Sequence, residues 1–126
     1  MAEVKPVRIG TGLDGAGLEI WKWPGVNGDD VCVPIVAPQW GKKTVYFVSA
    51  SPFGGRVALV GSAQVDVKED PERRYVPLSD PNNMPIAGLA GECAEVVQQN
   101  AYFIKPKMDP GVSGVDVYLI LSNARG

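Results

Sequence analysis

The chain has 126 residues, a formal net charge of −2 at pH 7 and no histidine. The length suits one domain with one core, and the small negative charge argues against a protein that binds nucleic acid or an anionic membrane through a basic field. Histidine is the commonest general base and the usual activator of a serine or cysteine nucleophile, so its absence favours a protein that is not an enzyme and uses no cofactor.

The first 17 residues are rich in glycine and hold few large apolar side chains. We therefore expect residues 1–17 to form an extended N-terminal arm, only partly fixed by a domain that occupies residues 18–126. The first six residues lack the apolar core of a secretory signal, and no stretch approaches the ~18 apolar residues of a membrane span. These features predict synthesis in a cytosolic compartment.

Short apolar runs separated by Gly and Pro follow in the next third of the chain. Strands are predicted for residues 18–23, 31–36, 43–50 and 56–61. Pro34 cannot donate a backbone hydrogen bond, which places residues 31–36 at a sheet edge or breaks that strand. Residues 43–50 and 56–61, joined by a Pro-Phe-Gly-Gly turn, are predicted to form a hairpin.

The second half continues the pattern after a charged loop at residues 62–72. Residues 75–78, 84–89, 101–106 and 115–121 are predicted to be short strands, and residues 91–100 suit a helix or a strand equally. In the last run, Val115, Val117, Leu119 and Leu121 share one face, which we assign to the core. About eight short strands with regular turns and no βαβ rhythm predict an all-β, antiparallel β-sandwich of the jelly-roll kind.

No constellation of residues predicts catalysis or metal binding. The acidic residues near positions 29–30 and 66–72 lie in polar turns, where a raised pKa is not expected, and they lack the spacing of a calcium loop. Residues 10–15 match G-x-G-x-x-G by letters, but no strand precedes them and no helix follows. Cys32 and Cys93 are predicted to be reduced, mostly buried side chains.

The tryptophans allow three interpretations. Trp21 and Trp23 are two residues apart in a predicted strand and so lie on the same face, and Trp40 follows in a loop. The pair can pack in the core, contact another subunit, or form a platform for sugar rings as in a carbohydrate-binding module. The sequence leaves all three open.

A set of motifs in a particular order points to a family. A Trp-Pro-Gly-Val-Asn-Gly-Asp-Asp turn at residues 23–30 precedes Pro-Phe-Gly-Gly-Arg-Val-Ala-Leu-Val-Gly-Ser at 52–62, Pro-Leu-Ser-Asp-Pro at 77–81 and Tyr-Phe-Ile-Lys-Pro at 102–106. Over residues 20–121 the chain resembles the head decoration, or cement, proteins of tailed bacteriophages. It departs from them in Ser51-Pro52, where Gly-Thr is usual, and in lacking the acidic residue before Gly61-Ser62 and the Asn-Asp-Gly after them.

The resemblance implies a virion protein that does no catalysis. It implies assembly as a homodimer or homotrimer on the exterior of an icosahedral capsid, where the protein bridges subunits of the major capsid protein after synthesis in the bacterial host cytoplasm. It implies no direct contact with nucleic acid or membrane. Another virion component, such as a tail or fibre-associated β-sandwich, and a carbohydrate-binding module are the alternatives.

Protein-interface residues are predicted from their chemistry and expected exposure. They fall in the arm, in the tryptophan pair and at the tip of the expected hairpin: Val4, Val7, Ile9, Leu13, Trp21, Trp23, Phe53 and Arg56.

Overall fold

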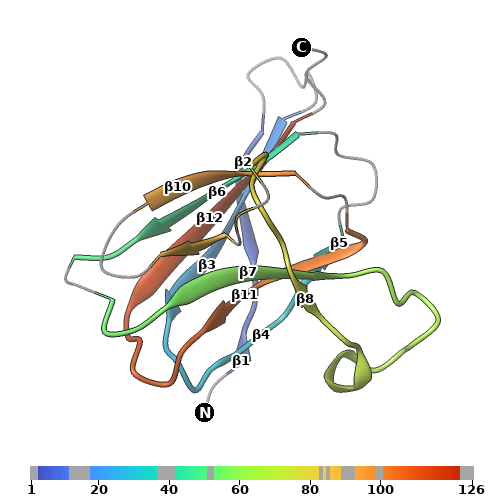
Figure 1. The fold of residues 1–126 in the computed structure, drawn as a ribbon, viewed down its shortest axis with the longest axis horizontal. Coiled ribbons are helices and arrows are strands. Elements are labelled where there is room, and N and C mark those ends of the chain that lie inside the picture. The colour runs from blue at the N-terminus through green and yellow to red at the C-terminus, as the bar shows by residue number, and fades with distance from the viewer. Residues whose placement is uncertain are drawn as a thin grey trace.

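The computed structural model describes residues 3–11, 18–36, 42–50, 53–82, 84, 86–88, 93–98 and 101–122. Within these ranges the chain is built of strands, and a single turn of 3-10 helix, η1, spans Asp70–Glu72. Figure 1 shows two layers of strands facing each other, with η1 in a loop at one side. The strands are β1 (Glu3–Val4), β2 (Val7–Thr11), β3 (Leu18–Val26), β4 (Val31–Cys32), β5 (Ile35–Val36), β6 (Lys42–Val48), β7 (Val57–Ser62), β8 (Val76–Pro77), β9 (Ala87–Gly88), β10 (Cys93–Val97), β11 (Phe103–Met108) and β12 (Val115–Ser122).

The strands form two antiparallel sheets. One has the order β10-β6-β12-β3-β2, and the other has the order β5-β11-β7-β8 with β9 also pairing with β7. A small parallel pair, β1 with β4, lies beside them. The fold is an antiparallel β-sandwich, as the sequence predicts.

The order of the strands identifies the jelly roll. When β3, β5, β6, β7, β8, β10, β11 and β12 are counted from one to eight, one sheet reads 6-3-8-1 and the other reads 2-7-4-5. Successive strands therefore alternate between the two sheets except at the fourth and fifth, which is the double Greek key of a jelly roll. β2 adds a fifth strand beside the first.

The core lies between the sheets and follows the alternation of side chains along each strand. Val115, Val117, Leu119 and Leu121 on β12 are at most 1% exposed, which confirms their predicted core face. The sheets meet over a continuous cluster that also holds Trp23 and many aliphatic side chains. Burial of these groups is the main force that holds the sandwich together.

The hairpin predicted for residues 43–50 and 56–61 is wrong. β6 pairs with β10 and β12, whereas β7 pairs with β11, β8 and β9, so the two runs lie in different sheets. Phe53 in their connection is fully buried in the core. A turn signal shows where the chain reverses but not which strand becomes the neighbour, and here burial of Phe53 accompanies a crossover between sheets.

The N-terminal segment also differs from its prediction. Of the arm expected at residues 1–17, the structure describes residues 3–11, and these form strands of the domain. β2 pairs with β3 along the edge of the five-stranded sheet, with a bulge near Ile9, and β1 pairs with β4. The glycines near β2 favoured a segment only partly held by the domain, but backbone hydrogen bonds to β3 hold it in the sheet.

Two uncertain regions are now defined. The strand expected at residues 31–36 is interrupted near Pro34, with β4 before it and β5 after it, as the missing amide hydrogen of proline predicts. In the region where helix and strand were both open, Cys93–Val97 is the strand β10, paired with β6.

Two loops meet closely at one end of the sandwich. The amide of Gly28 donates to the carbonyl of Val112 at 2.7 Å, and the amide of Gly114 donates to Asn27 Oδ1 at 2.9 Å. A Cβ atom on Gly28 would lie 2.1 Å from the backbone oxygen of Asp109. Only glycine fits at this position, so the turn at Asn27–Gly28 is part of the packing rather than a free loop.

Candidate functional site

Two of the predicted interface residues belong to the core. The side chains of Trp23 and Phe53 have no exposed surface, and the indole N–H of Trp23 donates to the carbonyl of Val33 at 2.8 Å. Neither residue is available to another molecule on the folded domain. The alternation therefore places Trp23 in the core, so Trp21 and Trp23 do not form an exposed platform for sugars.

The remaining predicted interface residues that the structure describes lie on β1, β2 and β3 and just before β7. Val4 and Trp21 are half-buried and pack against the core, whereas Val7 and Ile9 are 52% and 51% exposed on β2. Arg56 is exposed, although its amide is fixed by Asp109 Oδ2 at 3.0 Å. Leu13 lies outside the described residues, as does Trp40. Whether these residues contact a partner stays a prediction.

The outer side of the five-stranded sheet is the most distinctive surface. Because side chains alternate along strands and directly paired residues point to the same side, the outward residues follow from the register. Tyr118 pairs with Tyr46 and Lys22, Ile120 pairs with Thr44 and Ile20, and Val96 of β10 pairs with Thr44. We call this surface the sheet face; its described members are Val7, Ile20, Lys22, Lys42, Thr44, Tyr46, Val48, Ala94, Val96, Asp116, Tyr118, Ile120 and Ser122.

The sheet face has exposed apolar side chains on β10 and β6. Val96 is 51% exposed and Tyr46 is 40% exposed, and they lie on neighbouring strands beside Ala94, which is also exposed. An antiparallel sheet that has one side in water usually alternates apolar and polar residues, with the polar side outward. Here both sides carry apolar residues, which makes the face a candidate surface for binding another molecule.

The sheet face carries three charged side chains. Lys22 Nζ lies 3.7 Å from Asp116 Oδ2 and 5.2 Å from the centre of the Tyr118 ring, and these contacts with Tyr118 and Asp116 raise the pKa of Lys22. Asp116 pairs with Val48 at one end of β6, whereas Lys42 is exposed at the other end of the same strand. The face therefore has Lys42 at one end, Asp116 at the other, and Lys22 in the same row as Tyr46 and Tyr118.

Reasoning from the sequence missed most of the sheet face and found only Val7. The signal is present in Tyr46 and Val48, which alternate with Val45 and Phe47 in a run without charged residues. Such a run predicts a strand with apolar side chains on both sides of its sheet.

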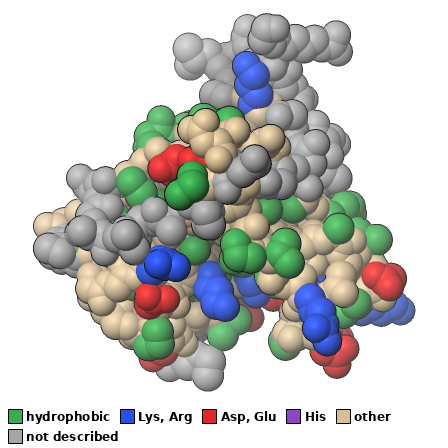
Figure 2. All heavy atoms as spheres, viewed as in Figure 1, with side chains coloured by type: hydrophobic (Ala, Val, Ile, Leu, Met, Phe, Trp, Pro, Cys, Tyr) green, Lys and Arg blue, Asp and Glu red, His purple; other side chains and the backbone are tan. Residues whose placement is uncertain are grey.

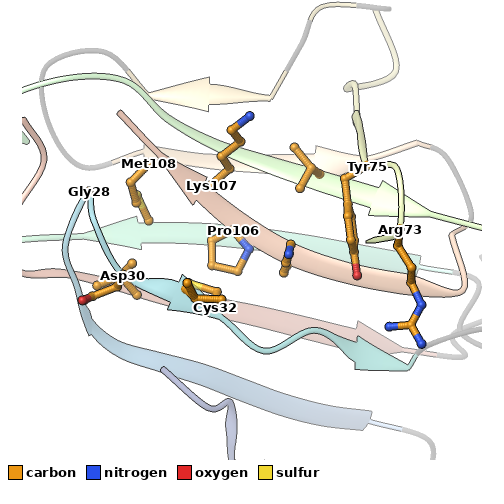
Figure 3. Close-up of a pocket in the computed structure, with 12 residues that line it drawn as sticks. Gly28, Asp30, Cys32, Arg73, Tyr75, Pro106, Lys107 and Met108 are labelled. Carbon is orange, nitrogen blue, oxygen red and sulfur yellow. The ribbon is translucent and has the colours of Figure 1, made fainter. Parts of the chain in front are cut away.

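A second feature is a pocket of about 400 Å³ at the edge of the other sheet. It opens where β4 separates from β11, and Figure 3 shows Pro106 and Cys32 at its middle, with Tyr75 and Arg73 toward one end and Gly28, Asp30 and Met108 toward the other. Its wall combines basic and apolar side chains.

One carboxylate organises the loop beside this pocket. Asp70 Oδ1 accepts hydrogen bonds from the Tyr75 hydroxyl at 2.5 Å and from Arg73 at 3.1 Å, and Asp70 Oδ2 accepts from Lys105 Nζ at 3.0 Å. Burial opposes ionisation of Asp70, but the hydrogen bonds from Tyr75, Lys105 and Arg73 hold its pKa below the usual range. The Arg73 guanidinium also lies 3.8 Å from the centre of the Phe103 ring. The basic groups are thus used to fasten the loop to β11.

The thiol in the pocket is not activated. Cys32 is 5% exposed, and burial raises the pKa of its thiol to about 12, so it is protonated at neutral pH. A nucleophilic cysteine needs the opposite shift. Among the residues described, no group of three His, Cys, Asp or Glu side chains is placed to hold a metal ion. Within the same ranges, no helix has the length and apolar character needed to cross a membrane.

Comparison with known proteins does not assign the chain to a family. No protein-family model matches the chain, and no curated protein matches it. Among solved structures, a cleaved adhesin domain of Lys-gingipain from Porphyromonas gingivalis is similar over 96% of this chain and 91% of that domain, at 13% sequence identity and a TM-score of 0.35. A likeness at this level carries no argument, so the fold assignment rests on the topology of the strands themselves.

Proposed function

We propose that the chain is a capsid decoration protein, which binds the exterior of an icosahedral phage head and reinforces contacts between subunits of the major capsid protein. The observation that carries the proposal is the apolar sheet face, with Tyr46 and Val96 exposed, on a rigid jelly roll. A fold alone does not assign a function, and jelly rolls occur in lectin and capsid proteins alike. The order of the Trp-Pro-Gly, Pro-Phe-Gly-Gly and Ile-Lys-Pro motifs favours the capsid role.

A decoration protein stabilises the shell through many modest contacts. Packaged DNA presses outward on a shell, and a protein that bridges neighbouring subunits adds buried area across each joint. Symmetry repeats the same contact over the whole particle, so weak individual contacts give a large combined resistance. A protein with this role needs a rigid fold and surfaces that bind other proteins, and it needs neither a catalytic group nor a cofactor.

The side opposite the sheet face carries charged groups that can also contact the shell. Figure 2 shows Lys and Arg side chains over the part of the molecule where Figure 1 places β7, β11 and the η1 loop. Lys107 on β11 and Arg56, which directly precedes β7, are exposed. Charged groups at the rim of a contact set the rate and register of association more than its strength.

The alternatives differ in copy number and ligand. A tail or fibre component would be present in a few to dozens of copies per particle, whereas a decoration protein is present in hundreds. A carbohydrate-binding module would need exposed aromatic rings in a row, and Trp23, one of the two expected to form that row, is buried. No described observation favours the sugar-binding alternative.

The test is cosedimentation of the purified chain with expanded heads that lack it. We expect saturable binding at a fixed ratio to the major capsid protein, and heads that withstand heating or chelators better when saturated. Absence of binding, or saturation at only a few copies per head, would reject a decoration role.

A further inference from the structure

We infer that the pocket between β4 and β11 binds an extended peptide segment of another protein, in which apolar and acidic side chains alternate. The inference goes beyond the proposed function, because binding of such a segment can be measured on the purified chain without a capsid. It rests on the open edge of β11 along the pocket, on the two kinds of side chain along that edge and on the charge at the rim.

β11 has an open edge where the pocket lies. β5 pairs with β11 at Phe103 and Ile104, and among the described residues no strand pairs with residues 105–108 on that side. These residues line the pocket. At about 3.4 Å per residue they offer an edge of about 14 Å. An unpaired edge of this kind is a template for another extended chain.

The backbone groups at the edge follow from the alternation within an antiparallel pair. The amide of Asp109 donates to the carbonyl of Arg56 at 2.9 Å, so Asp109 and every second residue before it direct their backbone groups toward β7. Pro106 and Met108 therefore direct theirs toward the pocket. The edge presents two carbonyl oxygens and one N–H, and the missing N–H of Pro106 limits the contact to a short segment.

The side chains along the edge divide by chemistry. Pro106 and Met108 are buried and point to the interior, whereas Lys105 and Lys107 point to the outer side of the sheet. A chain laid beside β11 alternates in the same way. Every second side chain of that chain would enter the apolar part of the pocket, where Figure 3 shows Pro106 and Cys32, and the others would lie beside the two lysines. The pocket therefore favours a segment in which apolar residues alternate with acidic ones.

The rim carries positive charge that Asp70 neutralises only in part. Arg73 and Lys105 share the carboxylate of Asp70, at 3.1 and 3.0 Å, and Lys107 is exposed and belongs to neither contact. Three cations therefore lie with one anion at this side of the pocket. Figure 3 shows Asp30 at the opposite end from Arg73. A carboxylate beside Lys107 would meet a complementary charge, whereas a basic segment would be repelled.

The size of the pocket suits a short segment. Its volume of about 400 Å³ lies near the lower end of the roughly 300–1,000 Å³ that is usual for ligand pockets. A small apolar carboxylate would fill the apolar part but leave the backbone groups of Pro106 and Met108 without partners. An extended peptide uses both features, so it is the ligand that the edge and the pocket together favour.

The experiment is an array of end-blocked pentapeptides probed with the fluorescently labelled chain. Each peptide has Glu at the second and fourth positions and an aliphatic or aromatic residue at the other three. We expect a subset to bind, with an affinity that falls by about 10-fold when Gln replaces Glu and that also falls as salt rises from about 0.05 to about 0.5 M. For the best binder, nuclear magnetic resonance should show the largest changes at the Met108 amide and methyl group and at the Lys107 amide.

Reversal of one rim charge gives the matched test. Lys107→Glu, at an exposed position, should weaken the best peptide by about 10-fold. Lys42→Glu makes the same change of charge at an exposed position on β6, in the other sheet, and should leave binding unchanged. Circular dichroism and melting curves check that both variants fold.

Four results would overturn the inference. They are an array without a binder, a best binder that maps to the sheet face, an equal effect of Lys107→Glu and Lys42→Glu, and octanoate that shifts the Met108 signals when no peptide does. The last would show a site for a small carboxylate. None of these results depends on cosedimentation with heads, so the proposed function and this inference fail separately.

Discussion

Asp70 is expected to be the main fastening of the η1 loop, and Asp70→Asn tests this directly. The substitution keeps the shape of the side chain but removes a charge that receives hydrogen bonds from Arg73, Tyr75 and Lys105. A hydrogen bond to a charged group contributes about 1.5–3 kcal/mol, and partial exposure reduces the sum of three. The Asp70 side chain is 23% exposed, so we expect a loss of about 2–4 kcal/mol in the free energy of unfolding at pH 7.

The pH dependence of that loss gives an independent check. The folded-state pKa of Asp70 lies below its ordinary value of 3.8, so its contribution is complete above about pH 5 and is lost as the pH falls through the folded pKa. Denaturant unfolding of the wild type and Asp70→Asn should show a gap that narrows from pH 6 to pH 2. Glu72→Gln, at an exposed position on the same 3-10 helix, should change stability by less than about 0.5 kcal/mol. A gap at pH 6 no larger than that of Glu72→Gln, or one that widens in acid, would refute the reasoning.

Three further predictions concern other parts of the molecule. Gly28→Ala should lower the free energy of unfolding by at least about 2 kcal/mol, because the new Cβ would meet the Asp109 backbone oxygen. Gly25→Ala meets no neighbouring atom but has a φ of +56°, so it should lower the free energy of unfolding by only about 1 kcal/mol. Equal melting temperatures for the two variants would contradict the close packing of the end loops. Lys43 is 1% exposed and burial lowers its pKa, so the cost of burying its charge falls as the pH rises from 7 toward 10.5. The stability of the wild type relative to Lys43→Met should therefore rise over this range, and a relative stability that falls would count against this. When the folded protein is labelled with a thiol reagent at pH 8, Cys93 should react well before Cys32, which is buried and has a raised pKa. Rapid labelling that persists in Cys93→Ser would show that the Cys32 thiol is more accessible than its burial implies.

The sequence predicts the fold class because the decisive signals are local. Alternation at Val115, Val117, Leu119 and Leu121 marks a core face, and Pro34 marks a break, since each depends on one side chain or one missing amide hydrogen. Counting such runs predicts a sandwich. The partner of each strand is a property of the whole chain, which is why the expected hairpin proved to be a crossover between the sheets.

The candidate site is harder to predict because exposure depends on the same global pairing. Trp23 and Phe53 are residue types that are common at interfaces, but at their positions in the fold the side chains are buried in the core. Tyr46 and Val96 look like ordinary strand residues and become neighbours on an open face only when β10 pairs with β6. Residue type alone predicts what a side chain prefers, and the register decides whether another molecule can reach it.

The decisive measurement is a cryo-electron microscopy reconstruction of the virion encoded by the same genome. We predict density for this jelly roll at symmetry-repeated positions on the outside of the head, in hundreds of copies. A head surface without this density, or the chain present only on the tail, would contradict the account.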